Sequence, residues 1–198
     1  MGKRAEAPSV NAGSMADIAF LLLIFFLVTT TIETDAGLAR MLPSTVPTPP
    51  ILKHNKNILE VSLNKNNELM VEGKEIPLAE LRQTAIAFID NGGEQGTCDY
   101  CKGEKLEDSS ENPLVAIIAV KNDRETTYEA YIAVQNELVV AYHALRNREG
   151  QYRYKQDYTA MEKSYNSPQA TIASKQQLKT RIKELQDLYP LHIVEPKN

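Results

Sequence analysis

Three observations predict a single N-terminal transmembrane helix, an extended linker and a small α/β domain of order β-β-α-β-α-α-β. The first is an apolar run before residue 33, and the second is a proline-rich stretch behind it. The third is a more polar remainder, in which short alternating or apolar strands are interleaved with amphipathic helical patterns. A chain of 198 residues is long enough for one modest domain with attachments.

The predicted membrane span covers residues 11–32 and follows a short cytoplasmic N-terminus, residues 1–10. A helix over 15–32 is about 27 Å long at 1.5 Å per residue, close to the ~30 Å hydrocarbon core of a bilayer. Lys3 and Arg4 precede the run, whereas Glu33 and Asp35 follow it. The positive-inside rule therefore places the rest of the chain outside the cytoplasm.

A cleaved signal peptide is the alternative interpretation of this segment. Lys3 and Arg4 would then be its basic region and 18–28 its apolar region. Asp17 interrupts the approach to that apolar region, and the sequence TTTIETDAGLAR after it holds no clean cleavage site. We therefore predict an uncleaved anchor, and both interpretations place the remainder in the same extracytoplasmic compartment.

Asp17 is a carboxylate at the start of the apolar run, and no basic residue inside the run neutralises it. A charged Asp in a membrane helix costs about 2.5–3.5 kcal/mol on insertion scales, and uptake of a proton avoids part of that cost. A group that exchanges protons is what a proton-conducting device needs. The alternative is an interfacial Asp that caps the N-terminus of the helix. The residue alone leaves both interpretations open.

Small residues lie near Asp17 on the same predicted helix face, where they would let another helix approach closely. The face and its N-terminal side comprise Asn11, Gly13, Ser14, Leu21, Ile24, Val28 and Thr31. Asp17 is therefore expected to face a partner helix or a wet cavity.

Residues 33–57 contain four prolines among serines and threonines, which is typical of an extended, semi-rigid linker. The domain, residues 58–198, opens with a predicted hairpin around Lys65-Asn66-Asn67. A helix beginning near Pro77 follows, with its apolar face formed by Leu78, Leu81, Ala85, Phe88 and Ile89.

The second half of the domain begins with a predicted strand over 114–122, which we expect to be buried on both faces. Thr126 or Thr127 can cap the helix that follows. Its expected buried stripe is Tyr131, Val134, Leu138 and Tyr142.

The C-terminal part, 151–190, is left partly undecided by the sequence. Residues 151–167 fit a continued helix, a loop or a binding face. An amphipathic helix carrying Leu178, Ile182, Leu185 and Leu188 is predicted before Pro190, followed by a short closing strand in LHIVEP.

An inserted loop, residues 91–113, is expected to be flexible and acidic and holds Cys98 and Cys101. A redox catalyst would place such a pair at a helix N-terminus, and a zinc site would need two more ligands. A small local disulfide or a pair of inert thiols is the favoured interpretation, and an oxidising compartment would favour the disulfide.

Several function classes have no support in the sequence. The formal charge of −4 and the lack of a basic stripe give no reason to expect nucleic-acid binding. No phosphate loop, catalytic-triad spacing or metal-ligand cluster is present in the sequence, so no enzyme activity, cofactor or metal is expected.

The segment VNAGSMADIAFLLLIFFLV resembles the N-terminal span of the ExbD/TolR family of biopolymer-transport proteins. That pattern has an Asn shortly before the membrane and an Asp six residues later, here Asn11 and Asp17. The usual Thr-Pro after the Asn is replaced by Ala12-Gly13. The β-β-α unit, and the strand and helix after the insertion, are similar to the family's periplasmic domain, whereas 91–113 and 151–190 have no counterpart.

The resemblance implies a bacterial inner-membrane motor subunit in which Asp17 takes up and releases protons. The implied partners are a ring of ExbB/TolQ-like multi-span subunits, a second copy of the chain and a TonB-like or envelope protein in the periplasm. The alternative is a TolR- or MotB-like subunit that anchors the system to peptidoglycan or an envelope protein. A third hypothesis, an anchored redox or metal enzyme, rests on Cys98 and Cys101 alone.

Overall fold

The computed structural model describes residues 12–29, 56–94, 96–169 and 171–196. The chain divides into two compact units, Met1–Ala39 and Arg40–Asn198. The first contains the helix α1, Ala12–Thr29. Across the parts of the chain that the structure describes, no helix meets both the length and the apolarity needed to cross a membrane. The N-terminus 1–10, both ends of the predicted span 11–32 and nearly all of the linker lie outside the described residues.

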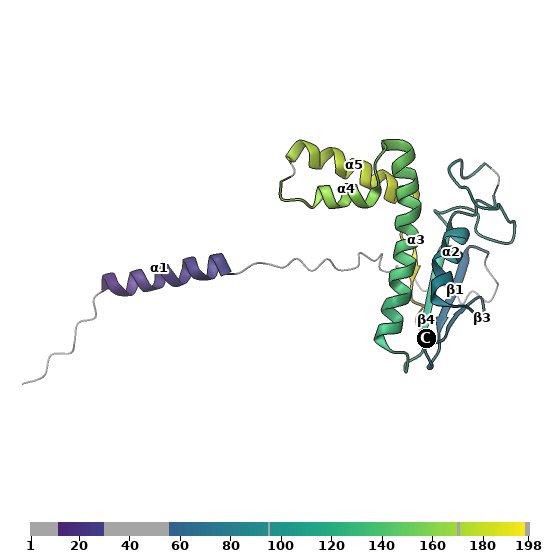
Figure 1. The fold of residues 1–198 in the computed structure, drawn as a ribbon, viewed down its shortest axis with the longest axis horizontal. Helices are drawn as coiled ribbons and strands as arrows, with labels where there is room; N and C mark the ends of the chain where they lie inside the picture. Colours follow the sequence, from purple (N-terminus) through teal and green to yellow (C-terminus); the bar gives the residue numbers. More distant parts are fainter. Residues whose placement is uncertain (1–11, 30–55, 95, 170, 197–198) are drawn as a thin grey trace, which may run out of the picture. The chain divides into compact units, whose positions relative to one another are not determined.

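The second unit is a small mixed α/β domain built on one five-stranded sheet (Figure 1). Its strands are β1 (Ile58–Leu63), β2 (Leu69–Val71), β3 (Lys74–Glu75), β4 (Ile117–Asn122) and β5 (Ile193–Val194). They lie in the order β3-β2-β1-β4-β5. The pairs that include β2 are antiparallel, whereas β4 runs parallel to both β1 and β5.

The first hairpin is set by a side chain in its turn. Asn64 Oδ1 accepts hydrogen bonds from the backbone N–H groups of Asn66 and Glu68, both 2.9 Å long. Asn67 adopts the left-handed conformation, with φ 64°, which Asn tolerates better than most residues. The resulting register pairs Val61 with Val71, so that buried side chains of β1 and β2 share one face.

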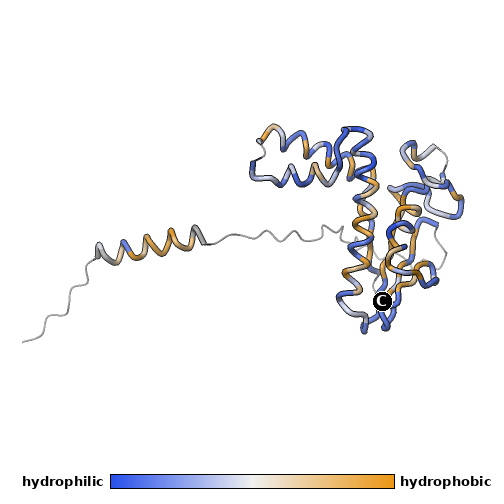
Figure 2. The backbone as a smooth tube through the Cα atoms, viewed as in Figure 1, coloured by the Kyte–Doolittle hydropathy of each residue, from blue (hydrophilic) through white to orange (hydrophobic). Residues whose placement is uncertain are grey.

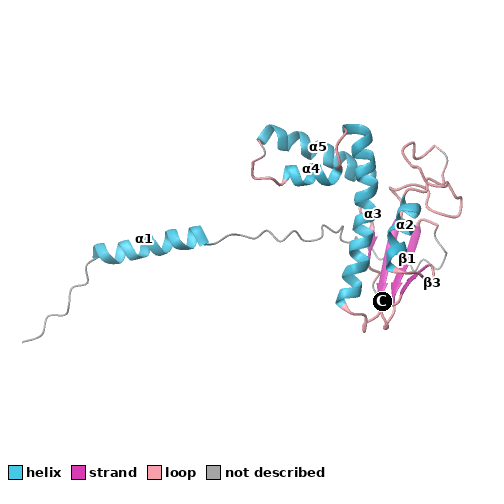
Figure 3. Ribbon diagram, in the orientation of Figure 1, coloured by secondary structure: helices cyan, strands magenta, loops and turns pink. Residues whose placement is uncertain are grey.

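Two helices cover that face of the sheet, α2 (Leu78–Ile89) and α3 (Tyr128–Tyr154) (Figure 3). The predicted face of α2 is buried at Leu81, Ala85, Phe88 and Ile89, but Leu78 is exposed because it lies at the first helical position. Thr127 caps α3 by accepting a hydrogen bond from the N–H of Ala130. The predicted stripe of α3 is buried at Val134, Leu138 and Tyr142 and half-buried at Tyr131.

The central strand is shorter than its apolar sequence predicts. β4 begins at Ile117, not at residue 114, because Asn112 makes a turn just before it. The Asn112 side-chain oxygen accepts from the N–H of Leu114, and its backbone oxygen accepts from those of Val115 and Ala116. Leu114 is consequently 51% exposed. The burial of β4 on both faces holds only for Ile118, Ala119 and Val120.

The C-terminal part resolves the undecided stretch into three pieces. Residues 151–154 continue α3, a left-handed C-cap at Lys155 ends that helix, and α4 covers Tyr158–Tyr165. Helix α5, Ile172–Leu188, packs beside α4 to form a helical hairpin (Figure 1). The hairpin has its own small apolar cluster around the buried Tyr158, Met161 and Leu185, with Leu178, Ile182 and Leu188 partly buried against it.

Candidate functional site

The first candidate site is the face of α1 that carries Asp17. Helix α1 begins at Ala12, and its first turn contains no acidic residue, so Asp17 does not occupy an N-cap position. With 3.6 residues per turn, Gly13, Asp17, Leu21 and Ile24 fall on one side of the helix, and all four are exposed in their unit. The backbone of α1 therefore places the carboxylate inside the helix, one to two turns from its start.

The remaining predicted face residues are only partly described. Ser14 and Val28 belong to α1 by their backbones. Asn11 and Thr31 lie outside the described residues.

Every residue of α1 from Ile18 to Phe26 is apolar, so this part of the helix is apolar on all sides (Figure 2). The large ones are exposed throughout, from 63% at Leu23 to 40% at Ile24. A helix that is apolar all round is stable only when lipid or protein covers it. The surroundings of α1 must therefore be apolar. Asp17 is the one charged residue of this helix.

The second candidate site is a polar junction inside the α/β domain, formed by Asp90, Tyr100, Arg148 and Tyr189. Asp90 follows α2 as its C-cap, Arg148 belongs to α3, and Tyr189 follows α5. Arg148 donates from Nη1 to Asp90 Oδ2 at 2.5 Å and from Nη2 to Asp90 Oδ1 at 2.8 Å. The Asp90 side chain is 5% exposed, so this fork-to-fork pair is largely withdrawn from water.

The two tyrosines connect this ion pair to the inserted loop and to the C-terminal hairpin. The Tyr189 hydroxyl donates to Asp90 Oδ1 at 2.8 Å. Tyr100 packs edge-on against the Tyr189 ring, with centroids 5.4 Å apart, and its hydroxyl donates to the backbone oxygen of Leu188 at 3.1 Å. The junction thus joins α2, the insertion, α3 and the end of α5.

Arg146 makes a second attachment two residues earlier in α3. Its Nε and Nη2 donate to the backbone oxygen of Tyr189 at 3.1 and 2.6 Å. The guanidinium also lies over the Tyr158 ring of α4, 5.2 Å from its centroid. Both helices of the hairpin are therefore fixed to α3 through Arg146.

The titration behaviour of the junction favours a structural role. Burial and the Asp90 charge raise the pKa of Tyr189, and burial raises the pKa of Tyr100. The hydrogen bond to Asp90 raises the pKa of Arg148. These shifts keep each group in its ordinary ionisation state at neutral pH, whereas acid–base catalysis needs a group poised near the operating pH.

Cys98 and Cys101 form a disulfide within the insertion. Gly92, with φ 65°, lies against this bridge, and a Cβ built there would be 2.8 Å from Cys101 Cβ. Glycine is required at that position by both its conformation and the space. Because the two sulfurs bond each other, neither thiolate is left for metal binding. In the described residues, no group of three or more His, Cys, Asp or Glu side chains converges on a common point.

The insertion is more ordered than its composition predicts. The buried Asn91 side chain donates to the backbone oxygens of Leu106 and Ser110 at 2.9 and 2.7 Å, and it accepts from the N–H of Leu106 at 2.9 Å. The buried hydroxyl of Ser110 donates to the oxygen of Phe88. The expectation of a flexible loop was wrong for 96–113, because buried polar side chains supply the hydrogen bonds that regular structure would supply.

Sequence reasoning missed Asp90, Arg146, Arg148 and Tyr189. All four are polar or charged. Asp90, Arg146 and Tyr189 each follow an apolar residue directly, whereas Arg148 lies between Asn147 and Glu149. Such neighbours are ordinary at the edge of an amphipathic face, and nothing local distinguishes a buried pair from a solvated one. Only the partners, 58 residues apart for Asp90 and Arg148, identify the pair.

Comparison with known proteins adds one finding. A family model described as "Biopolymer transport protein ExbD/TolR" matches residues 3–146. The match includes α1, with Asp17, and the domain through most of α3, and it ends at Arg146. A comparison with curated proteins gives no match.

Proposed function

The chain belongs to the ExbD/TolR family of biopolymer transport proteins, and from this premise we propose that it is a subunit of an inner-membrane motor driven by the proton-motive force. Its working partner is an ExbB/TolQ-like proton channel made of multi-span subunits arranged as a ring. The driven process is TonB-dependent transport across the outer membrane. The protein is a transport subunit, not an enzyme.

The observation that carries this proposal is Asp17 inside α1, one to two turns from its start, as the one charged residue of a helix that is apolar from Ile18 to Phe26. The proposed span, 11–32, extends beyond both ends of α1 and has the length of a bilayer core. The N-terminus faces the cytoplasm, and a homodimer of such helices lies inside the ring. An acidic residue in that setting faces the helix bundle or a water path, where it can carry protons.

Proton transfer by Asp17 supplies the change in charge that a motor needs. A neutral carboxyl and a carboxylate have different affinities for the two arrangements of helix and ring, so proton binding and release shift the equilibrium between them. Each proton crossing 100 mV releases about 2.3 kcal/mol. The linker, 33–57, transmits the movement to the periplasmic domain, which engages a TonB-like protein.

The decisive experiment replaces Asp17 by Asn in the full chain and measures two quantities, co-purification with the ring subunits and uptake through a TonB-dependent receptor. We expect normal assembly and loss of uptake, because Asn is nearly isosteric but cannot exchange a proton at physiological pH. Asp35→Asn, an acidic residue beyond the span, is the matched control and should leave uptake unchanged.

Unchanged uptake by an assembled Asp17→Asn variant would reject the motor. If uptake remained and envelope integrity were lost on deletion of the domain 58–198, the TolR- or MotB-like anchoring function would replace it. Cys98→Ser/Cys101→Ser tests the redox or metal enzyme, and we expect that variant to retain uptake.

A further inference from the structure

Charge is segregated within the α/β domain. Residues 58–149 contain nine basic and seventeen acidic residues, a formal charge of −8. Residues 163–183, here called the arm tip, contain five basic residues and no acidic one. The five are Lys163, Lys175, Lys179, Arg181 and Lys183. The arm tip comprises the end of α4, the connection to α5 and most of α5.

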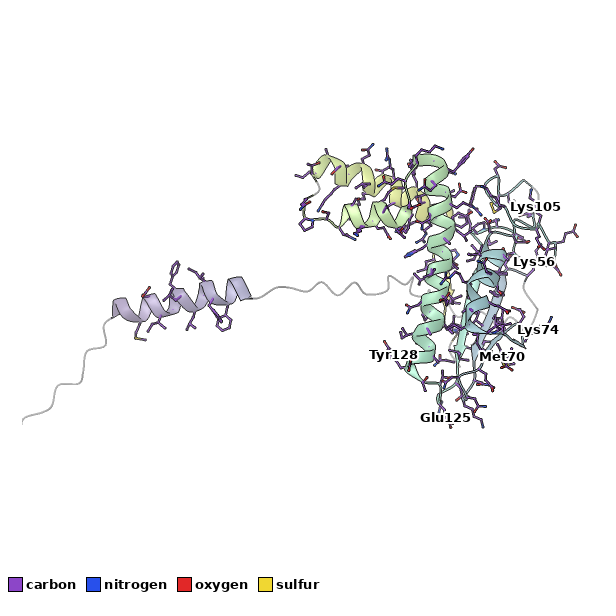
Figure 4. The ribbon with its side chains drawn as sticks, in the orientation of Figure 1. Lys56, Met70, Lys74, Lys105, Glu125 and Tyr128 are labelled. Carbon is purple, nitrogen blue, oxygen red and sulfur yellow. A yellow bond between two sulfur atoms is a disulfide. The ribbon has the colours of Figure 1, made fainter. Side chains whose placement is uncertain are left out.

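The arm tip belongs to the part of the chain that follows the family match, which ends at Arg146. The hairpin of α4 and α5 projects from α3 on the side opposite Lys105 of the insertion (Figure 4). Its apolar faces are used internally, because Tyr158, Met161 and Leu185 pack together between the helices. The exposed residues of the hairpin are mainly polar, and residues 158–188 contain five basic and three acidic residues, a formal charge of +2.

From these features we infer that the arm tip docks on the anionic phospholipid headgroups of the membrane that holds α1. This inference rests on the proposed function, since it requires the chain to be anchored in that membrane. Lys163, Lys179 and Lys183 are exposed and are free to approach a surface. Basic residues near an anionic leaflet are attracted to it within about one Debye length, ~8 Å at physiological salt.

Two further features of the arm tip fit a lipid surface. Ile172, the first residue of α5, is 87% exposed. Figure 2 shows an apolar stretch at the start of α5 in the mainly polar hairpin. Lys175 follows Ile172 by three residues, and an exposed apolar side chain near a basic one is typical of segments that rest in the interface of a bilayer. A shallow hollow at the end of α4 is lined by Lys163, Ser164, Asn166 and Ser167, whose ammonium, hydroxyl and amide groups can donate hydrogen bonds to a phosphate.

The acidic body of the domain favours the same arrangement. An anionic surface repels a body of charge −8 and attracts the arm tip, so the domain is oriented with the arm toward the bilayer. The 25 residues of the linker span at most about 85 Å when fully extended, which limits how far the domain can leave the membrane. Docking of the arm tip would hold the domain closer to the membrane than this upper limit.

The test uses the full chain reconstituted in vesicles, with Gln169→Cys carrying a fluorophore and quencher attached to a small share of the lipid headgroups. Cys98 and Cys101 are bonded to each other, so the label is selective under non-reducing conditions. We expect quenching of the fluorophore in vesicles with one third phosphatidylglycerol and little quenching in pure phosphatidylcholine. Quenching in the anionic vesicles should fall several-fold when salt rises from 50 to 500 mM.

Charge variants separate the arm tip from the rest of the domain. Lys163→Gln/Lys175→Gln/Lys179→Gln should lower the docked-to-free ratio roughly 100-fold, at about fivefold per lysine. The matched control, Lys65→Gln/Lys74→Gln/Lys105→Gln, removes three exposed lysines from the body and should leave quenching unchanged. Equal quenching in both lipid compositions, or a triple arm variant that behaves as the wild type, would overturn the inference.

Other partners give different results. Quenching that rises with the protein-to-lipid ratio would assign the arm tip to a second copy of the chain, and binding to isolated cell-wall glycan without quenching would assign it to that polymer. Either outcome contradicts lipid docking. A chain that fails to float with vesicles of either composition rejects the membrane anchor and the proposed function, whereas flotation without quenching rejects only the inference.

Discussion

Asp90, whose side chain is buried, and Arg148, which is partly buried, form a two-pronged ion pair that joins the end of α2 to α3, with nitrogen–oxygen distances of 2.5 and 2.8 Å. The same carboxylate accepts from the Tyr189 hydroxyl and from the N–H of Lys102. One acidic side chain therefore holds the insertion, the central helices and the C-terminal hairpin in a fixed arrangement.

Arg148→Met should lower the free energy of unfolding by about 3 kcal/mol, because it leaves a buried carboxylate without its counter-ion. Denaturant titration of the purified chain measures the change. Arg82→Met is the matched control: its pair with Glu137 is more exposed, so we expect a loss below about 1 kcal/mol. Equal losses for the two variants would show that the Asp90–Arg148 pair contributes no more to the free energy of unfolding than the more exposed Arg82–Glu137 pair.

The Cys98–Cys101 disulfide closes a very short loop, so its effect on stability is modest. The chain-entropy relation gives about 2 kcal/mol for a loop of this length. Reductant should lower the denaturation midpoint of the wild type to that of Cys98→Ser/Cys101→Ser and leave the double variant unchanged. A midpoint insensitive to reductant in the wild type would contradict the stabilising role of the bridge.

His143 should make stability depend on pH. Burial lowers the pKa of His143, and the nearby Arg146 charge adds to this effect, while Glu162 opposes it. The unfolded chain, with a histidine pKa near ~6.5, then binds more protons than the folded chain. The contribution is therefore complete above about pH 6.5 and is lost as the pH falls through the folded-state pKa.

The measurement compares denaturation midpoints of the wild type and His143→Gln between pH 8 and pH 5. We expect the wild type to lose more stability than the variant over the acidic part of this range. Parallel pH profiles for the two proteins would show that His143 does not titrate differently in the folded and unfolded states.

Leu185→Ala tests whether the hairpin has its own core. Leu185 is fully buried with Tyr158 and Met161, so truncation should cost about 3 kcal/mol. Hydrogen exchange should show loss of amide protection in α4 and α5 while β1 and β4 remain protected, since those strands belong to the main core. The exposed Lys179→Ala on the same helix should change stability by less than about 0.5 kcal/mol. Uniform loss of protection would indicate a single cooperative core.

Much of the element order follows from local patterns. Alternate residues of 58–63 share one face of a strand, and Leu81, Ala85 and Phe88 share one face of a helix. Only that type of element gives each set a single buried face, so each pattern selects its element. The two-residue strand β3 carries too few residues to show a period. The predicted start of β4, at residue 114, is three residues too early. An apolar run does not reveal the turn at Asn112, which keeps residues 114–116 out of the strand.

The sequence by itself determined the apolar helix with one acid, the amphipathic faces and the resemblance to a family, because each of these depends on residues close together in the chain. The tertiary structure decided the junction, in which Asp90 meets Tyr189 across 99 residues, and the union of the C-terminal hairpin with the domain. It also decided that β5 completes the sheet beside β4. Side chains distant in the chain meet only when the whole core is assembled, and a burial pattern specifies which face is covered without specifying what covers it.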